Sequence, residues 1–188
     1  QACATLGIHG KICGPPTTPR QKRDRMLSLG KNYIELVVVG DTYDEASALA
    51  KQAAEESGGV LVPAFDDPRT IAGQGTVARE ILTQLGRIPD TVIVPVGGGG
   101  MLAGCLTWLR ANSPKTRVIG AEPSGAACLA VALEAGQPRD LPSIDTFVDG
   151  AAVRRVGDLT FEIAERLKPR MISVPEGRIC SEMLQLYQ

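Results

Sequence analysis

Thr91-Val-Ile-Val-Pro-Val96-Gly97-Gly98-Gly99-Gly100-Met101-Leu-Ala-Gly104 is the stretch that decides the fold of this 188-residue sequence. Its first six residues are almost all apolar and have the length of a buried strand. Four consecutive glycines follow, and then an amphipathic helix begins. Glycines allow left-handed backbone conformations and a close approach to a ligand. The stretch therefore predicts a strand, a loop of exposed main-chain amides and a helix.

Such a loop favours an anion as its ligand. Successive N–H groups can point into one concavity, and the helix that begins near Met101 adds partial positive charge at its N-terminus. A phosphate or a carboxylate fits this environment, and a tight turn without a ligand is the structural alternative. The loop has no Gly-Lys-Ser/Thr sequence, which excludes the phosphate loop of nucleoside triphosphatases.

A dinucleotide-binding loop is a second interpretation of this stretch. The spacing of Gly98, Gly100 and Ala103 fits the relaxed dinucleotide fingerprint. Glu122 follows about 20 residues later at the end of a predicted strand, where an acid would hold a ribose. From the loop alone, the ligand is a phosphorylated cofactor of unspecified type.

On both sides of this loop, predicted strands and helices alternate, which indicates an α/β fold with mostly parallel sheets. Asp41 or Thr42 can cap the helix at 43–57, and Asp66-Asp67-Pro68 offers a turn and a cap for the helix that ends at Leu85. The predicted strands are 10–14, 34–39, 60–63, 91–96, 117–122 and 171–175, and the predicted helices are 1–7, 19–29, 43–57, 68–85, 101–111, 127–135, 158–167 and 176–188.

The composition narrows the function classes. With 44% hydrophobic and 22% charged residues and a net charge of -1, the chain can bury a core and has no attraction for nucleic acid. No apolar stretch approaches the roughly 20 residues that a membrane span needs. The five cysteines form no Cys-x-x-Cys pair, and His9 is the single histidine. These features predict a reducing, cytoplasmic location, cysteines that act as core residues, and no His-rich metal site.

Several longer motifs closely resemble the serine/threonine dehydratase family of pyridoxal phosphate enzymes, and the resemblance covers nearly the whole chain. The motifs are Thr18-Pro-Arg-Gln-Lys22, Gly40-Asp-Thr-Tyr-Asp-Glu-Ala46, Phe65-Asp-Asp-Pro68, Ile71-Ala-Gly-Gln-Gly-Thr76, the glycine loop itself, Gly120-Ala-Glu-Pro123 and Phe147-Val-Asp-Gly-Ala-Ala-Val-Arg-Arg-Val-Gly-Asp158.

The resemblance implies a tryptophan synthase β-like, fold type II enzyme of two three-layer α/β domains, truncated at both ends in this chain. Residues 1–65 would belong to the small domain and residues 66–188 to the large, cofactor-binding domain. The cofactor would be pyridoxal 5′-phosphate, with its phosphate held by Gly97, Gly98, Gly99, Gly100 and Met101. The segment at 149–151 resembles the stretch that passes beside the cofactor ring.

The implied activity is a lyase reaction of isoleucine biosynthesis. It converts L-threonine to 2-oxobutanoate and ammonia, or L-serine to pyruvate and ammonia, and family members assemble as homo-oligomers. A nicotinamide-dependent oxidoreductase with a Rossmann-type loop and a non-catalytic phosphate-binding module are the alternatives.

The resemblance also implies that part of the active site is missing. The motif with the Schiff-base lysine lies upstream of residue 1, so none of the six lysines matches it, and we assign no catalytic residue in this chain. We expect the chain alone to be inactive and to be an interior fragment, because its first helix lacks an N-cap and its last lacks a stop signal. Some relatives bind a divalent cation through the glutamate that matches Glu122 and a second carboxylate. Cys128 stands near that second position here, so we expect no metal site.

Overall fold

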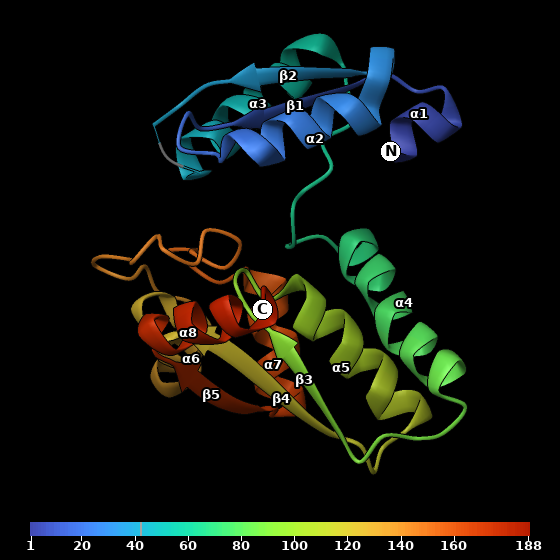
Figure 1. The fold of residues 1–188 in the computed structure, drawn as a ribbon, viewed down its shortest axis with the longest axis vertical. Helices are drawn as coiled ribbons and strands as arrows, with labels where there is room; N and C mark the ends of the chain where they lie inside the picture. Colours follow the sequence, from blue (N-terminus) through green and yellow to red (C-terminus); the bar gives the residue numbers. More distant parts are fainter. Residues whose placement is uncertain (42) are drawn as a thin grey trace. The chain divides into compact units, whose positions relative to one another are not determined.

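The computed structural model describes residues 1–41 and 43–188, and these form two compact units, 1–61 and 62–188 (Figure 1). The cap predicted at Thr42 lies outside the described residues. Of the elements predicted from the sequence, all but one strand are present, with ends that differ by one or two residues. The α/β class with parallel sheets is confirmed.

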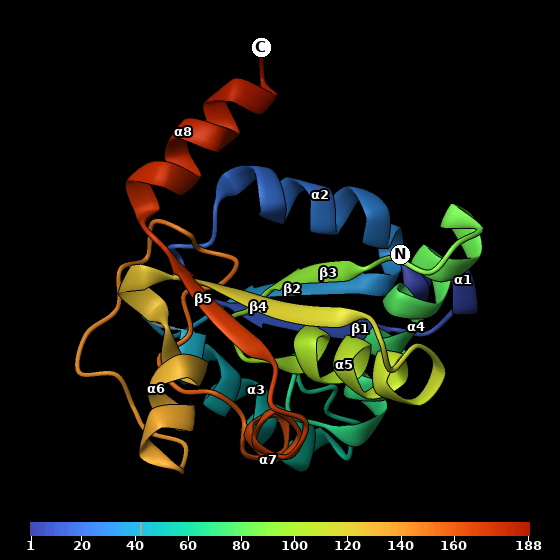
Figure 2. The same ribbon diagram turned by 90° about the horizontal axis from the view of Figure 1, so that it is seen from below.

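The first unit is built on two parallel strands. Its elements are α1 (Ala2–Leu6), β1 (Gly10–Gly14), α2 (Arg20–Gly30), the 3-10 helix η1 (Lys31–Tyr33), β2 (Ile34–Val38) and α3 (Tyr43–Ser57). The register runs from Gly10 opposite Ile34 to Gly14 opposite Val38. Figure 2 shows α2 and α3 on opposite sides of this pair. A parallel pair needs such crossover helices because consecutive parallel strands cannot be joined by a tight turn.

The prediction of a strand at 60–63 is wrong, because this stretch forms no strand. Val60 and Val62 are 80% and 79% exposed, and the stretch runs across the boundary between the two units. Apolar β-branched residues favour a strand only where a neighbouring strand can pair with their backbone. Among the described residues, no strand pairs with this stretch.

The second unit contains an all-parallel sheet in the order β3-β4-β5. Its elements are α4 (Pro68–Leu85), β3 (Thr91–Pro95), α5 (Gly100–Asn112), β4 (Arg117–Pro123), the 3-10 helix η2 (Ser124–Ala126), α6 (Cys128–Ala135), α7 (Asp158–Leu167), β5 (Arg170–Val174) and α8 (Glu176–Leu186). Figure 2 shows α5, α6 and α7 on the same side of the sheet. Because the three strands are parallel, their carboxyl ends meet at one edge of the sheet, where α/β proteins bind ligands.

The core of the second unit lies between the sheet and these helices. Leu102, Leu106 and Leu109 on α5 are almost completely buried. Burial of each leucine side chain stabilises the fold by about 1.5 to 3 kcal/mol. They pack in one cluster with Val94, Val96, Val118, Leu129, Val156 and Phe161. This cluster fixes α5, and with it the loop that precedes α5.

Two glycines allow α4 to pack closely against α5. A Cβ atom on Gly104 would collide with the carbonyl oxygen of Ile71 and would lie 2.6 Å from the amide nitrogen of Gly75. A Cβ on Gly75 would lie 3.2 Å from the Gly104 carbonyl oxygen. Gly75 and Gly104 thus let the backbones of the two helices approach each other. Asp67 caps α4 as predicted, accepting from the Arg69 and Thr70 amides at 2.8 and 3.3 Å.

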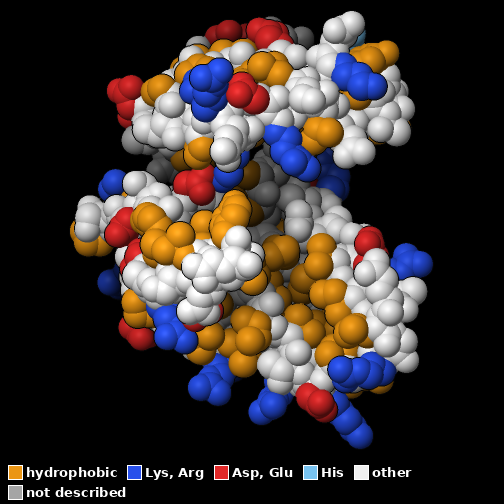
Figure 3. Space-filling view, viewed as in Figure 1, with side chains coloured by type: hydrophobic (Ala, Val, Ile, Leu, Met, Phe, Trp, Pro, Cys, Tyr) orange, Lys and Arg blue, Asp and Glu red, His pale blue; other side chains and the backbone are white. Residues whose placement is uncertain are grey.

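The surface of the second unit keeps some large apolar side chains exposed. Ile93 on β3 is 61% exposed, and Leu85 and Ile88 are also exposed. Figure 3 shows hydrophobic side chains gathered on the face that carries β3, α4 and α5. In the part of the chain that the structure describes, no helix is both long and apolar enough to span a membrane.

The prediction that the cysteines act as core residues is confirmed for two of the five and wrong for the other three. All five cysteines are free thiols, with Cys105 and Cys128 buried and the other three partly exposed. His9 lies between α1 and β1, and its ring centroid lies 5.3 Å from that of Tyr33. This ring contact gives His9 a packing role.

Candidate phosphate-binding site

The glycine loop follows β3 directly at the carboxyl edge of the sheet. Gly98, Gly99 and Gly100 are buried, and α5 begins at Gly100. Gly99 has a φ of 90°, which favours glycine because other residues are strained there. The predicted strand, glycine loop and helix are therefore present in that order.

The carbonyl oxygens of the first three loop residues are all held by protein donors. The Cys128 thiol lies 3.5 Å from the Gly97 oxygen, and the Thr160 hydroxyl donates to the Gly98 oxygen at 2.8 Å. The Gly99 oxygen accepts from the Ala103 amide at 2.8 Å, which is the first hydrogen bond of α5. The donors come from α6, α7 and α5, so three helices orient the loop.

Because these carbonyls are held, the amides that follow them are oriented too. No peptide bond in the described chain is cis, and in a trans peptide the C=O of one residue and the N–H of the next point in opposite directions. The N–H groups of Gly98, Gly99 and Gly100 therefore point away from the donors on α6, α7 and α5.

These amides have no partner in the protein. Within residues 1–41 and 43–188, no N–H group from Gly97 to Met101 donates to a protein acceptor. Buried amides without partners are rare, because an unpaired buried donor costs about 1 to 3 kcal/mol. We call these five N–H groups the amide cradle. An anion would satisfy them, and the N-terminus of α5 would add favourable potential.

Close packing behind the loop explains why four glycines occur in a row. A Cβ on Gly98 would overlap the Phe65 ring, and one on Gly100 would lie 2.8 Å from the Phe65 Cβ. A Cβ on Gly97 would lie 3.0 Å from the Ala151 Cα atom. The structure thus brings the 149–151 segment, which resembles the stretch beside the cofactor ring, against the first residue of the cradle.

Glu122 cannot hold a ribose, which contradicts the dinucleotide reading. Its side chain is 1% exposed at the end of β4. Its two carboxyl oxygens accept from the amides of Leu129 and Ala130 at 2.8 and 3.0 Å, so the side chain caps α6. Burial raises the pKa of this carboxyl to about 7, although the two amides act in the opposite direction. The carboxyl thus stabilises a helix and does not face a ligand.

Cys128 is a thiol donor at neutral pH. Burial, followed by the nearby Glu122 carboxyl, raises the pKa of its thiol to about 12. A protonated thiol can donate to the Gly97 carbonyl, and it is a poor metal ligand and nucleophile. Among the described residues, no three His, Cys, Asp or Glu side chains are grouped as a metal site would require.

Two side chains that support the loop, Asp66 and Thr160, were not identified from the sequence. The Asp66 carboxylate accepts from the Asp158 and Leu159 amides, both at 3.0 Å, and from the Thr160 amide at 3.2 Å. It therefore caps α7, whose own N-cap residue is Gly157. A helix that begins without a Ser, Thr, Asp or Asn cap was the one available signal that a remote side chain supplies the cap.

The two lysines of the second unit lie away from the cradle. Lys115 follows the C-terminal end of α5, and Lys168 follows the C-terminal end of α7. The N-terminal ends of these helices adjoin the glycine loop. With 13 and 10 residues, α5 and α7 are about 20 and about 15 Å long, so both lysines lie far from the glycine loop.

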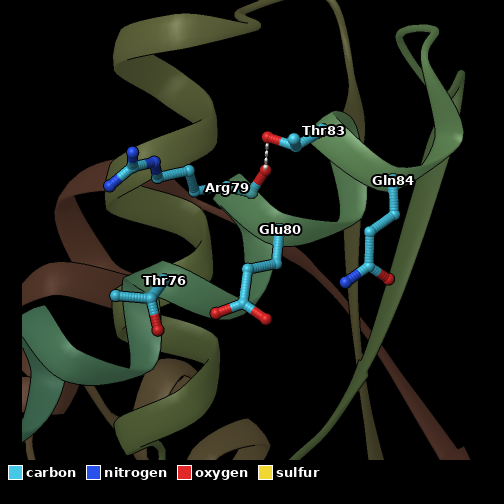
Figure 4. Close-up of a pocket in the computed structure, with 5 residues that line it drawn as sticks. All are labelled: Thr76, Arg79, Glu80, Thr83 and Gln84. Atoms are coloured by element: carbon cyan, nitrogen blue, oxygen red, sulfur yellow. Dashed lines mark hydrogen bonds between the residues drawn. The ribbon is translucent and has the colours of Figure 1, made fainter.

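A hollow elsewhere on the second unit is separate from the loop. Five side chains of α4 line it, and Figure 4 shows them on successive turns of the helix. They are Thr76, Arg79, Glu80, Thr83 and Gln84. The Thr83 hydroxyl donates to the Arg79 carbonyl oxygen at 2.9 Å and is part of the helix surface. None of the cradle residues lines this hollow.

Comparison with known proteins places the whole chain in one family. The sequence profile of the family described as "Pyridoxal-phosphate dependent enzyme" matches residues 1–188. The chain belongs to this family. It is 50% identical over 191 aligned positions to the biosynthetic L-threonine dehydratase of Corynebacterium glutamicum, which covers 99% of this chain and 44% of that protein.

Solved structures of the family have the same fold. The processed form of threonine deaminase isoform 2 from Solanum lycopersicum matches with a TM-score of 0.83 and 41% identity, over 93% of this chain and 50% of that one. Maize serine racemase matches with a TM-score of 0.86 and 33% identity, over 100% of this chain and 55% of that one. The chain thus spans about half the length of the relatives that it matches.

Proposed function

We propose that this chain supplies the phosphate-binding part of a pyridoxal 5′-phosphate-dependent L-threonine dehydratase, also called threonine ammonia-lyase. The observation that carries the proposal is the amide cradle at Gly97–Met101. Its N–H groups donate to no acceptor among the described residues, and it lies at the N-terminus of α5. The similarity to biosynthetic L-threonine dehydratases supports this substrate class, with products 2-oxobutanoate and ammonia. L-Serine, which would give pyruvate, is the second candidate substrate.

The residues present fit the phosphate of this cofactor. The cradle offers main-chain donors to its oxygens, and Cβ atoms on the loop glycines would meet protein atoms behind the loop, so side chains there would displace these donors. When bound, pyridoxal 5′-phosphate supplies an electron sink for reactions at the α-carbon of an amino acid. The Ala151 segment packs against Gly97 and supports a place for the ring beside that segment.

Within this reaction, the chain's own residues bind and orient. The N–H groups of the cradle hold the phosphate, and the donors on α5, α6 and α7 keep these groups aligned. Each amide that donates to a charged phosphate contributes about 1.5 to 3 kcal/mol. Precise placement of the phosphate sets the position of the reacting end of the cofactor, which is how binding groups far from the reacting atoms affect rate.

The two units correspond in this proposal to parts of two enzyme domains. Residues 1–65 would belong to the small domain and residues 66–188 to the large, cofactor-binding domain. The division of the structure at 61/62 and the position of the cradle in the second unit support this assignment. We also infer a cytoplasmic location, which the biosynthetic role of the relatives supports, and assembly as a homo-oligomer. Size-exclusion chromatography of the complete protein tests the oligomer.

The test of function uses the complete protein. We expect it to release 2-oxobutanoate from L-threonine only after reconstitution with pyridoxal 5′-phosphate, and pyridoxal without the phosphate should not replace it. Titration with NADH should give no saturable change in fluorescence. If the reconstituted protein released neither 2-oxobutanoate nor pyruvate, the proposal would be wrong.

A matched pair of variants tests the cradle. Gly98→Ala places a methyl group on the Phe65 ring and should weaken binding of pyridoxal 5′-phosphate at least about tenfold, the equivalent of one lost donor. Gly73→Ala, on the exposed face of α4 with open space around its Cα, should leave the affinity unchanged. Equal affinities for the two variants would argue against the loop as the phosphate site.

A further inference from the structure

Thr160 is one of the few buried polar side chains of the second unit. It lies in the first turn of α7 and is 1% exposed. Its hydroxyl oxygen lies 2.8 Å from the Gly98 carbonyl oxygen and 3.1 Å from that of Gly157. A hydroxyl has a single proton to donate, and the shorter contact goes to Gly98. The side chain thus links α7 to the glycine loop across 62 positions of sequence.

This contact determines which way one peptide unit faces. The unit between Gly98 and Gly99 has no Cβ atom on either side, so its rotation is unusually free. A flip of this unit would replace the Gly99 N–H group in the cradle by the Gly98 carbonyl, whose partial negative charge repels a phosphate. The Thr160 hydroxyl holds that carbonyl on the α7 side, with a weaker contribution from the Gly157 amide at 3.4 Å.

The position of Thr160 is itself held by Asp66. The carboxylate accepts from three amides in the first turn of α7, including that of Thr160 at 3.2 Å. A Cβ on Gly157 would overlap the same carboxylate, so the helix end and Asp66 are in close contact. The N–H groups in the first turn of α7, which have no partner within the helix, thus donate to Asp66 and do not compete with the cradle for an anion. Phe65, next in the chain, packs against Gly98.

We propose that Thr160 is a positioning residue for the cofactor's phosphate, because its hydroxyl holds the Gly98 carbonyl away from the cradle and so directs the Gly99 N–H group toward the anion. This inference rests on the proposed function, since it takes the phosphate of pyridoxal 5′-phosphate as the ligand. Asp66 acts one step further out, by fixing the first turn of α7 from which the hydroxyl projects.

The experiment compares two probes on the complete protein after removal of its cofactor. The probes are pyridoxal 5′-phosphate and pyridoxal, titrated by their absorbance. Thr160→Val removes the hydroxyl at nearly constant shape and should weaken pyridoxal 5′-phosphate about fivefold to tenfold, as expected for one hydrogen bond. The affinity for pyridoxal should change less than about twofold, because the cradle does not contact it. Thr160→Ser keeps the hydroxyl and should restore the phosphate-dependent affinity.

A second readout and a control separate positioning from packing. The phosphorus NMR signal of the bound cofactor should shift in Thr160→Val and return in Thr160→Ser. Thr83→Val, which removes an exposed hydroxyl that donates to a carbonyl of α4, should leave both affinities unchanged. If Thr160→Val does not fold, Asp66→Asn, which keeps one of the two acceptor oxygens, should show a smaller loss specific to pyridoxal 5′-phosphate.

The outcomes distinguish this inference from the proposed function. If the unaltered protein bound pyridoxal 5′-phosphate no better than pyridoxal, the phosphate cradle and the positioning role would both be wrong. If it preferred the phosphate but Thr160→Val lost nothing, or lost affinity for both probes equally, only the positioning role would be overturned.

Discussion

The buried carboxyl of Glu122 makes a specific prediction about how stability depends on pH. Burial raises its pKa from the ordinary value of 4.5 to about 7. The folded chain therefore retains this proton in a pH interval where the unfolded chain has lost it. Stability from this group is fully present below pH 4.5 and is lost as the pH rises toward about 7.

The magnitude follows from the size of that interval. Each pKa unit corresponds to about 1.4 kcal/mol, so the interval from 4.5 to about 7 corresponds to about 3 kcal/mol of unfolding free energy. Glu122→Gln removes the titration. Its amide keeps one acceptor oxygen, so one of the two helix amides that Glu122 caps loses its partner at every pH, at a cost of about 1 kcal/mol.

The assay is urea unfolding, monitored by the fluorescence of Trp108, the single tryptophan, which lies in the second unit. The stability advantage of the unaltered chain over Glu122→Gln should fall by up to about 3 kcal/mol between about pH 4.5 and about pH 7.5. As a control, Glu162→Gln lies at an exposed position of α7, and its difference in unfolding free energy from the unaltered chain should stay constant across this pH range. A difference between the unaltered chain and Glu122→Gln that stays constant within about 0.5 kcal/mol would refute the reasoning.

Three further predictions concern packing, reactivity and activity. Gly73→Ala should stabilise the chain by about 1 kcal/mol in urea unfolding, because it improves helix propensity where an added Cβ meets open space. Gly104→Ala should destabilise the chain by about 1 to 3 kcal/mol, because its Cβ meets the backbone of α4. A change of the same sign in both variants would contradict the close packing of α4 and α5. Cys128 should resist thiol reagents at neutral pH until the chain unfolds, because the pKa of its thiol is raised to about 12. Peptide mass mapping measures the labelling, and labelled Cys128 in the folded chain would contradict the prediction. The 188-residue chain alone should release no 2-oxobutanoate from L-threonine even with pyridoxal 5′-phosphate present, and turnover by the purified chain would show that an essential lysine is within it.

Local sequence signals predicted most elements of the fold. The glycine run after an apolar strand and Asp67 before Pro68 act on neighbouring residues, and the structure contains the elements that they predict. The exception is the stretch at 60–63, where strand-forming valines have no strand to pair with. Propensity is local, but a strand requires a partner from elsewhere in the chain.

The candidate site was predicted only in part. The glycines of the loop could be named from the sequence because glycine allows a left-handed backbone and a close approach to other atoms. The sequence left Glu122 open as a ribose ligand, whereas the structure turns its carboxyl onto α6. It gave no sign that Asp66 caps a helix 92 positions later, because capping residues normally precede their own helix closely.

By itself, the sequence therefore determined the order of strands and helices and the residues that can approach an anion, since both depend on the properties of adjacent residues. Tertiary structure alone decided which way the loop's peptide units face. That orientation depends on Cys128 and Thr160, which meet the Gly97 and Gly98 carbonyls only after α6 and α7 pack beneath the sheet edge. A planar peptide carries its N–H opposite its C=O, so these distant contacts convert a flexible run of glycines into an oriented set of donors.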